Sequence, residues 1–404
     1  MSSATVEIAP PVKTSYSELT SHRSCPQRWF YAKMLGLSKI PDPSDPKVEM
    51  HMGSWWHAVL AADSWQRALR HGSLAKPPKR LRGGHDVLID TETPPTPETV
   101  IEAASRHWLT LAEDEKAAWD HKIGDTLPAR LTDLYASWLE RWERDREFER
   151  PLAMELGWSR QLTDTVRLVG YIDEVYFDTR RNLVVVRDHK TAKALGTQSA
   201  LDDMMDSQLQ LYAWGASPEI TSWGQGQVQA TAYDRIKTVK PTKPRLNKSG
   251  TLSKQTTQYD LRTYLDWVAQ EQRYEGLAKD GSGAGIYKAD PSVIEHLTSP
   301  SWQSMWHQRT LVPLNSNMIR AHLVSAMDTA ADAARTRERA LAEGAAARNL
   351  GGACKWCDFA ALCRAQIAGG PDGEYPLAQY GLTHPSMTVL TGIAVREGNQ
   401  EKEK

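Results

Sequence analysis

Apolar and polar residues alternate along the middle of the chain in a pattern typical of β-strands. Three strands are predicted in succession, over 157–163, 166–178 and 183–192. A helix over 203–215 and a fourth strand over 226–238 follow them. The order β-β-β-α-β, with helices before and after it, predicts an α/β fold.

Helical spacing of apolar residues predicts helices on both sides of this core, over 50–71, 100–147, 257–279 and 315–343. The segment 100–147 is predicted to be a helical insertion. A first helix should begin near Ser15, because Ser15 and Glu18 fit the S-x-x-E capping box. Pro26 then suits the first position of a second helix.

The composition excludes some classes of protein. The chain has 404 residues and a formal net charge of -1, which argues against a strongly basic protein that only coats DNA. It does not exclude an enzyme with a local basic channel. The N-terminal residues hold no long apolar segment, and no stretch of the sequence approaches the apolar length of a membrane span. We therefore expect a cytoplasmic protein.

Four cysteines are a candidate metal site, since structural disulfides are rare in the cytosol. Three of them, Cys354, Cys357 and Cys363, form C-x2-C-x5-C, and Cys25 is the only other cysteine in the sequence. Four thiolates suit either zinc or an iron–sulfur cluster, and the spacing does not separate the two. The alternative is that the thiols pack as small apolar groups.

Candidate catalytic residues lie on the predicted strands 166–178 and 183–192. Asp173 is in G-x-x-D, and the apolar run before Asp188 ends in D-x-K with Lys190. Side chains two apart share one face of a strand, and pairing of the two strands would bring Asp173 to that face. Two carboxylates can hold Mg²⁺ or Mn²⁺, and a nearby ammonium can stabilise charge that develops on phosphorus.

Each of these motifs is weak when it is taken alone. An Asp/Lys pair on a surface hairpin is common, and His57 beside two tryptophans could be a packed histidine. Gln208 and Tyr212 form Q-x-x-x-Y, which places both on one face of the predicted helix but also fits ordinary amphipathic patterning.

A basic segment follows the fourth strand and is a candidate DNA contact. Its Lys and Arg residues include Lys237, Lys240, Lys243, Arg245 and Lys248. Such residues neutralise phosphates without sequence preference. A solvated basic loop is the alternative.

Taken in order, the motifs resemble the RecB-like PD-(D/E)XK nucleases, including the AddB nuclease domain, CRISPR-associated RecB-like exonucleases and phage-encoded relatives. The order is an N-terminal cysteine, G-x-x-x-H, G-x-x-D, D-x-K, Q-x-x-x-Y and C-x2-C-x5-C. The resemblance implies a restriction-endonuclease-like fold, an α/β mixed central sheet flanked by helices. The insertion before Asp173 is long, and the nucleotide-binding motif G-x-x-x-x-G-K-[ST] of helicases is absent from the sequence.

The resemblance also implies roles for individual residues. His57, Asp173, Asp188 and the backbone carbonyl of His189 would bind the metal ion, and Lys190 would be the catalytic lysine. Gln208 and Tyr212 would contact DNA or brace the site. The four cysteines would hold a [4Fe–4S] cluster, which favours iron–sulfur over zinc.

We therefore expect a metal-dependent DNA nuclease, an exonuclease acting on DNA ends or single strands in a bacterial or phage-infected cytoplasm. Two rivals are a non-catalytic iron–sulfur DNA-binding protein that keeps the same fold, and a metal protein unrelated to nucleic acid. The expected organisation is a disordered leader (1–13), an N-terminal helical region (14–156), the nuclease core (157–240), a basic loop (241–256), a C-terminal helical region (257–350), the cysteine segment (351–370) and a tail (371–404).

Overall fold

The structure is a computed structural model that describes residues 12–40, 47–83, 87–90, 92–196, 200–244, 259–274, 291–368 and 379–382. A mixed six-stranded sheet forms its centre, as predicted. The strands of this sheet are β1 (Val12–Ser15), β5 (Glu149–Thr163), β6 (Val166–Asp178), β7 (Leu183–Ala192), β8 (Val228–Lys237) and β9 (His307–Pro313). The β1–β6 and β7–β8 pairs are parallel, and the β5–β6, β6–β7 and β8–β9 pairs are antiparallel.

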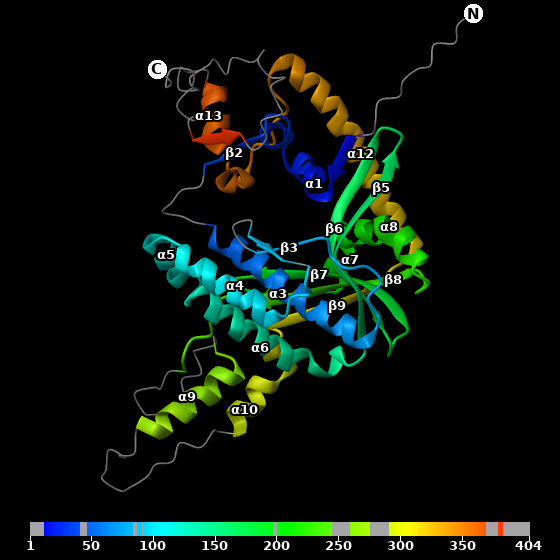
Figure 1. The fold of residues 1–404 in the computed structure, drawn as a ribbon. Helices are drawn as coiled ribbons and strands as arrows, with labels where there is room; N and C mark the ends of the chain where they lie inside the picture. Colours follow the sequence, from blue (N-terminus) through cyan, green and yellow to red (C-terminus); the bar gives the residue numbers. More distant parts are fainter. Residues whose placement is uncertain are drawn as a thin grey trace, which may run out of the picture.

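Helices cover both faces of the sheet (Figure 1). One apolar cluster contains Ile236 of β8 and side chains of α3 (Val48–His71), α4 (Pro97–Thr110), α5 (Glu113–Ile123) and α6 (Leu127–Arg146). A second cluster contains Tyr233 of β8 and side chains of α1 (Tyr16–Ser24), α8 (Ser207–Ser222) and α12 (Ser316–Glu343). Since residues 233 and 236 differ by an odd number, they point to opposite faces of the strand. The sheet is therefore buried from two sides.

Local signals in the sequence set several helix ends. Ser15 is the N-cap of α1, and its hydroxyl accepts from the amide of Glu18 at 3.3 Å. The return contact of the expected capping box is replaced, because the Glu18 carboxylate accepts from the indole N–H of Trp29 at 3.3 Å. Pro26 opens α2 (Pro26–Trp29), as expected, and a π-helical turn, η1 (Phe30–Met34), follows it directly.

Segments from the two ends of the sequence lie side by side at the top of Figure 1. Phe30 and Tyr31 of η1 share an apolar cluster with Phe359 and with Leu362 of α13 (Ala360–Ala368). Strand β2 (Leu37–Lys39) pairs with β10 (Tyr380–Leu382), and the 3₁₀ turn η3 (Gly352–Trp356) carries Cys354. The amide of Ala346 donates to the side-chain oxygen of Gln27 at 2.6 Å. The expected union of N- and C-terminal regions is therefore present.

The connection between β8 and β9 forms a small helical unit. It contains α9 (Leu261–Tyr274), α10 (Pro291–Thr298) and α11 (Pro300–Gln303). Side chains of this unit make an apolar cluster of their own around Tyr259, Trp302 and Trp306. The unit projects from the sheet and its flanking helices beyond α6 (Figure 1).

Several elements differ from the sequence-based expectations. Strand β1 begins at Val12, inside the expected leader, and β5 begins at Glu149, before the expected core. Strand β9 was not predicted, and neither was the hairpin of β3 (Leu81–Arg82) with β4 (Leu88–Ile89). The predicted helix over 203–215 is two helices, α7 (Ala200–Met205) and α8. Across the residues that are described, no helix has both the length and the apolar character needed to cross a membrane.

Candidate active site

A gap on one edge of β6 creates the candidate active site. β1 pairs with this edge from Val166 to Val169, and β7 pairs with it from Glu174 to Asp178. The residues between the two ladders, 170–173, end in Asp173. The side chain of Asp173 therefore lies where β6 and β7 separate, and the backbone amide of His189 donates to its Oδ2 at 2.7 Å.

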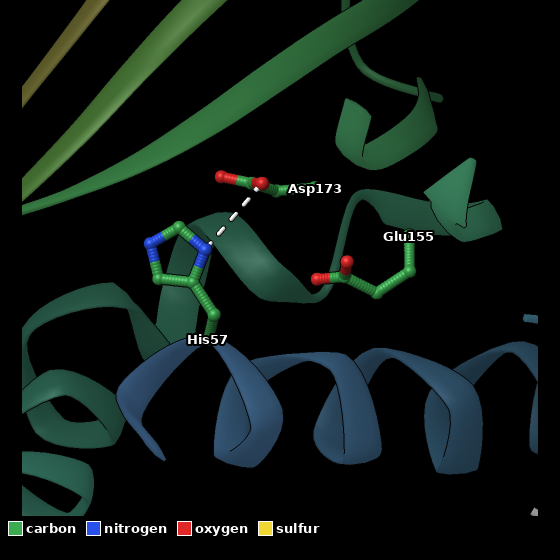
Figure 2. Close-up of side chains that lie close together, drawn as sticks. All are labelled: His57, Glu155 and Asp173. Atoms are coloured by element: carbon green, nitrogen blue, oxygen red, sulfur yellow. Dashed lines mark ion pairs between the residues drawn. The ribbon is translucent and has the colours of Figure 1, made fainter. Parts of the chain in front are cut away.

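Three side chains from different elements converge at this gap (Figure 2). Ligand atoms of His57 on α3, Glu155 on β5 and Asp173 on β6 all lie within 4.8 Å of one another. The Nδ1 atom of His57 is 3.4 Å from Oδ1 of Asp173. Figure 2 shows His57 rising from α3 toward Asp173, with Glu155 beside them. Among the described residues this is the one group of three or more His, Cys, Asp or Glu side chains with such spacing.

His57 and Asp173 stabilise each other's charged forms. Burial opposes ionisation of both groups, but their mutual attraction wins. It raises the pKa of His57 to about 9 and lowers the pKa of Asp173 to about 2. Gly53, one turn before His57, lets α3 approach β7, because a Cβ atom there would meet Oγ1 of Thr191 at 3.0 Å. The G-x-x-x-H motif thus sets the height of the imidazole above the sheet.

Glu155 is a site residue that the sequence analysis missed. Its backbone has φ of +48°, the left-handed region, which costs an ordinary residue about 1–2 kcal/mol. Burial and the neighbouring Asp173 raise the pKa of Glu155 to about 7. A strained backbone that holds a carboxylate against another carboxylate is typical of a functional position. The only signal in the sequence was an acid within an apolar strand.

Asp188 and Lys190 lie on one face of β7, as their spacing predicts. The Nζ atom of Lys190 is 2.7 Å from Oδ2 of Asp188. Burial and Asp173 raise the pKa of Asp188 to about 6, although Lys190 acts against this shift. Burial would lower the pKa of Lys190, but Asp188 outweighs burial and raises it. Lys190 is therefore charged at neutral pH, beside the gap.

Gln208 at the start of α8 braces this pair. Its amide oxygen accepts from Lys190 at 3.3 Å, and its amide nitrogen donates to Oδ1 of Asp188 at 3.3 Å. Tyr212, one turn later, packs edge-on against Trp158 with ring centroids 5.3 Å apart.

Two glycines make room for Trp158. A Cβ atom on Gly170 would lie 3.0 Å from its ring, and a Cβ atom on Gly215 of α8 would lie 2.1 Å from it. The glycine of G-x-x-D thus lets Trp158 fill the space between β6 and α8.

A buried network of charges lies on the opposite face of β7. Arg187 is fully buried and pairs with Glu149 and with Glu174, the latter at 2.8 Å. The imidazole of His189 lies between Asp234 at 3.7 Å and Glu174 at 3.9 Å. Burial lowers the pKa of His189 to about 4. The observed contact of His189 with Asp173 is through its backbone amide, whereas the metal ligand expected from this residue is its backbone carbonyl.

The predicted DNA-contacting lysines are separated from this gap. Lys237 ends β8, and its Nζ lies 4.3 Å from the centre of the Trp306 ring. Lys240 pairs with Asp125 at 2.6 Å. Lys237, Lys240 and Lys243 all line one cavity at the end of β8. Arg245 and Lys248 lie outside the described residues.

The four cysteines are half-buried and belong to the region where the two chain ends meet. Cys357 and Cys363 pack on the apolar cluster of η1 and α13. Burial raises the pKa of the Cys357 thiol, and Cys25 is close enough to raise it further. Cys25 is thus brought close to the cysteine segment of the other chain end.

The residues at the gap fit a divalent metal ion. Two carboxylates offer the hard oxygen ligands that Mg²⁺ and Mn²⁺ prefer, and the imidazole of His57 adds a nitrogen ligand. A cation would also offset the repulsion between Glu155 and Asp173. Asp188 is outside this close group because its carboxylate faces Lys190 and Gln208.

Comparisons with known proteins identify the family of the chain. The family model described as the PD-(D/E)XK nuclease superfamily matches residues 13–364. Among solved structures, the chain is similar to a phage related exonuclease from Haemophilus somnus 129PT, at 10% identity and a TM-score of 0.20, over 65% of this chain and 91% of that one. No curated protein matches the chain. Because the family match spans most of the sequence, and the fold is a mixed sheet flanked by helices, the chain belongs to the PD-(D/E)XK nuclease superfamily.

Proposed function

We propose that the protein is a metal-dependent DNA exonuclease that acts on DNA ends or single strands during recombination, replication or other DNA processing. The observation that carries the proposal is the meeting of His57, Glu155 and Asp173 at the gap beside Lys190. The exonuclease assignment rests on the order of the motifs from Cys25 to Cys363.

The metal ligands in this proposal are His57, Glu155 and Asp173, with Asp188 and the carbonyl of His189 next to them. When bound, Mg²⁺ or Mn²⁺ supplies Lewis-acid polarisation of the phosphate and a lowered pKa of bound water. To bind a metal ion, His57 needs a ring nitrogen that carries no proton. Asp173 stabilises the protonated imidazole and raises the pKa of His57 to about 9. Metal binding should therefore release that proton.

Lys190 acts on the phosphate in this proposal. Its ammonium is held between Asp188 and Gln208 at the edge of the gap. A fixed positive charge at this place stabilises the negative charge that develops on the phosphate oxygens during hydrolysis. Gln208 keeps the ammonium in place, and Tyr212 supports Gln208 from the next turn of α8.

The four cysteines are proposed to hold a structural [4Fe–4S] cluster. The preference for iron–sulfur over zinc rests on the order of the motifs, which resembles that of the RecB-like nucleases. Cys25 lies close enough to Cys357 to raise the pKa of its thiol, which supports a shared site for the two chain ends. Such a cluster would join residues 25 and 363 and stabilise the union of the chain ends.

Digestion of end-labelled DNA tests the proposed function. Single- and double-stranded substrates are incubated with Mg²⁺, Mn²⁺ or EDTA, using protein that is purified without oxygen. We expect metal-dependent cleavage by the wild type and loss of cleavage in Asp188→Ala and Lys190→Ala. Lys116→Ala is the matched control, because Lys116 pairs with Glu113 on the outer helix α5.

Product length distinguishes an exonuclease from an endonuclease. An exonuclease releases short products from one labelled end, and the choice of label gives the polarity. Equal cleavage by the wild type and by both active-site variants would overturn the catalytic assignment.

A further inference from the structure

A cavity of about 260 Å³ lies at the end of β8, outside the group of His57, Glu155 and Asp173. Residues of α6, β8, the segment after β8 and α9 line it, together with Trp306. Its volume falls just below the range of about 300–1,000 Å³ that is typical of small-molecule pockets. A cavity of this volume holds at most a group of small-molecule size.

The lining of this cavity is rich in cationic side chains. Five basic residues line it, Arg130, Lys237, Lys240, Lys243 and Arg262. Three acidic residues also line it, Asp133, Asp260 and Asp266. Asp260 also caps α9 by accepting from the amide of Thr263 at 2.8 Å. Lys240 is paired with Asp125, so the four other cations face three carboxylates, and the small positive excess favours an anion such as a phosphate group.

Arg130 builds the rim of the cavity. Its guanidinium donates to the carbonyls of Thr238 at 2.7 Å, Val239 at 3.1 Å and Lys237 at 3.3 Å. Three carbonyls fix the chain as it leaves β8, so Lys237 and Lys240 are held in place. Burial and Arg130 lower the pKa of Lys237, which means that its positive charge is under-compensated. An anion at this position would relieve that repulsion.

Aromatic rings form the apolar part of the lining. Trp306 is buried beneath Lys237, and half-buried Trp267 stacks on Tyr264 with centroids 6.4 Å apart. Flat aromatic faces beside cations are what unpaired bases and their phosphates bind. Duplex bases cannot use such a face, because both of their faces are covered by neighbouring bases.

Lysines lie along the chain segments between the gap and this cavity. Lys190 pairs with Arg235, and Ala192 pairs with Lys237, so Lys237 lies two positions beyond the strand neighbour of Lys190. Beyond Ala192, Lys193 contacts Glu49 at 2.5 Å, and Glu49 also faces Lys122 at 3.9 Å. The next residue, Ile123, accepts at its carbonyl from the amide of Lys240 at 2.9 Å. Basic side chains therefore recur between the gap and the cavity rim, and Glu49 and Asp125 lie among them.

We propose that this cavity binds one unpaired nucleotide of a DNA strand whose scissile phosphate lies beside Lys190. The base stacks on Trp267, and Lys237 and Arg262 contact its phosphates. The proposal rests on the proposed nuclease function and names its substrate as single-stranded DNA, or a duplex end with an unpaired strand.

Binding of fluorescein-labelled dT12 tests this site. Anisotropy is measured in the Asp188→Ala background, so that the oligonucleotide is not cut. We expect Trp267→Ala and Lys237→Gln to weaken binding at least about fivefold. Trp267→Phe keeps an aromatic face and should retain most of the affinity. Lys116→Ala serves as the control for loss of a remote charge. Unchanged affinity in both Trp267→Ala and Lys237→Gln would overturn the proposal.

Photocrosslinking locates the nucleotide directly. A complex of the protein with an oligonucleotide that contains 5-iodo-deoxyuridine is irradiated. The crosslinked peptide is then identified by mass spectrometry. A crosslink at Trp267 supports the proposal, and crosslinks confined to other segments contradict it.

The outcomes separate this proposal from the proposed function. If the wild type cuts DNA but the Trp267 and Lys237 substitutions leave the affinity for dT12 unchanged, the nuclease function is supported and the nucleotide site is contradicted. If the wild type does not cut DNA with either metal but dT12 crosslinks to Trp267, the nucleotide site is supported and the nuclease function is contradicted.

Discussion

The Oδ2 atom of Asp173 accepts a hydrogen bond of 2.7 Å from the backbone amide of His189, across the gap where β6 and β7 separate. The other oxygen of the same carboxylate lies 3.4 Å from His57. Asp173 thus joins three elements, α3, β6 and β7, at one point. Its position depends on backbone geometry more than on flexible side chains, which favours a pre-organised site.

Asp173→Asn should separate the structural role of this residue from its charge. The amide oxygen of asparagine can still accept from His189, so folding should be retained. Loss of the charge should reduce Mn²⁺ affinity and lower the cleavage rate by more than the 10–100-fold that is typical of outer-shell changes, about 100-fold or more. Calorimetric titration with Mn²⁺ and single-turnover cleavage measure the two effects. Cleavage within threefold of wild type would contradict a ligand role for Asp173.

Glu155 should show opposite effects on stability and on metal binding. Glu155→Gly relieves the strain at φ of +48° and removes a carboxylate from the side of Asp173. We expect an unchanged or higher Tm without metal, together with weaker Mn²⁺ binding and slower cleavage. Glu155→Gln is the matched variant, because it loses the charge but keeps the strain. Normal metal affinity in both variants would exclude Glu155 as a ligand.

Arg187 should be essential for folding stability. It is fully buried between Glu149 and Glu174, and Arg187→Met would leave these carboxylates without a central partner. The expected loss is about 3–5 kcal/mol of unfolding free energy. Arg181→Ala is the control, because Arg181 is 47% exposed and its ion pair with Asp178 should contribute below about 1 kcal/mol. Urea denaturation compares the two, and equal midpoints would contradict this account of the network.

Strand periodicity predicted Asp188 and Lys190 on one face, and Asp173 was expected to reach that face through pairing of the two strands. Strand β6 and β7 boundaries also follow directly from alternation and turn residues. The sequence did not predict Glu155, because its position depends on a single left-handed backbone angle and on the pairing of β5 with β6. Neither feature has a local signal in a non-glycine residue.

The buried network was missed for a different reason. Arg187 and His189 alternate with Asp188 and Lys190 along β7, but their partners come from β5, β6 and β8. Strand β9 was also not predicted, because Arg309 gives its sequence a polar character. In the structure this arginine is paired with Asp234 at 2.7 Å. Contacts between residues so far apart in sequence cannot be predicted from patterns along one segment.

His307 should make the protein less stable in mild acid. Burial lowers its pKa to about 4, although Asp234 acts against this shift. The unfolded chain, with a histidine pKa near 6.5, binds a proton below that pH while the folded protein does not. The contribution of neutral His307 is therefore complete above pH 6.5 and is lost as the pH falls toward 4.

Replacing His307 tests this pH dependence. In His307→Gln, the difference in unfolding free energy from wild type should change by about 2 kcal/mol between pH 7 and pH 5, with the variant gaining relative to wild type. Urea denaturation at several pH values measures this difference. Parallel pH profiles of the two proteins would show that His307 titrates normally in the folded state.

Cys25→Ser should separate the two chain ends if the four cysteines hold an iron–sulfur cluster. Cys25 is the cysteine most distant in sequence from the other three, so its loss opens the longest loop that the cluster would close. Loop-closure entropy for a cross-link of this length gives an expected destabilisation of up to about 5 kcal/mol. Iron and sulfide content, absorbance near 400 nm and Tm should fall together in protein purified without oxygen. Lys33→Ala, an exposed change on η1, is the control for this region. Zinc in place of iron in the wild type would contradict the cluster, whereas iron retained in Cys25→Ser would remove Cys25 from its ligands.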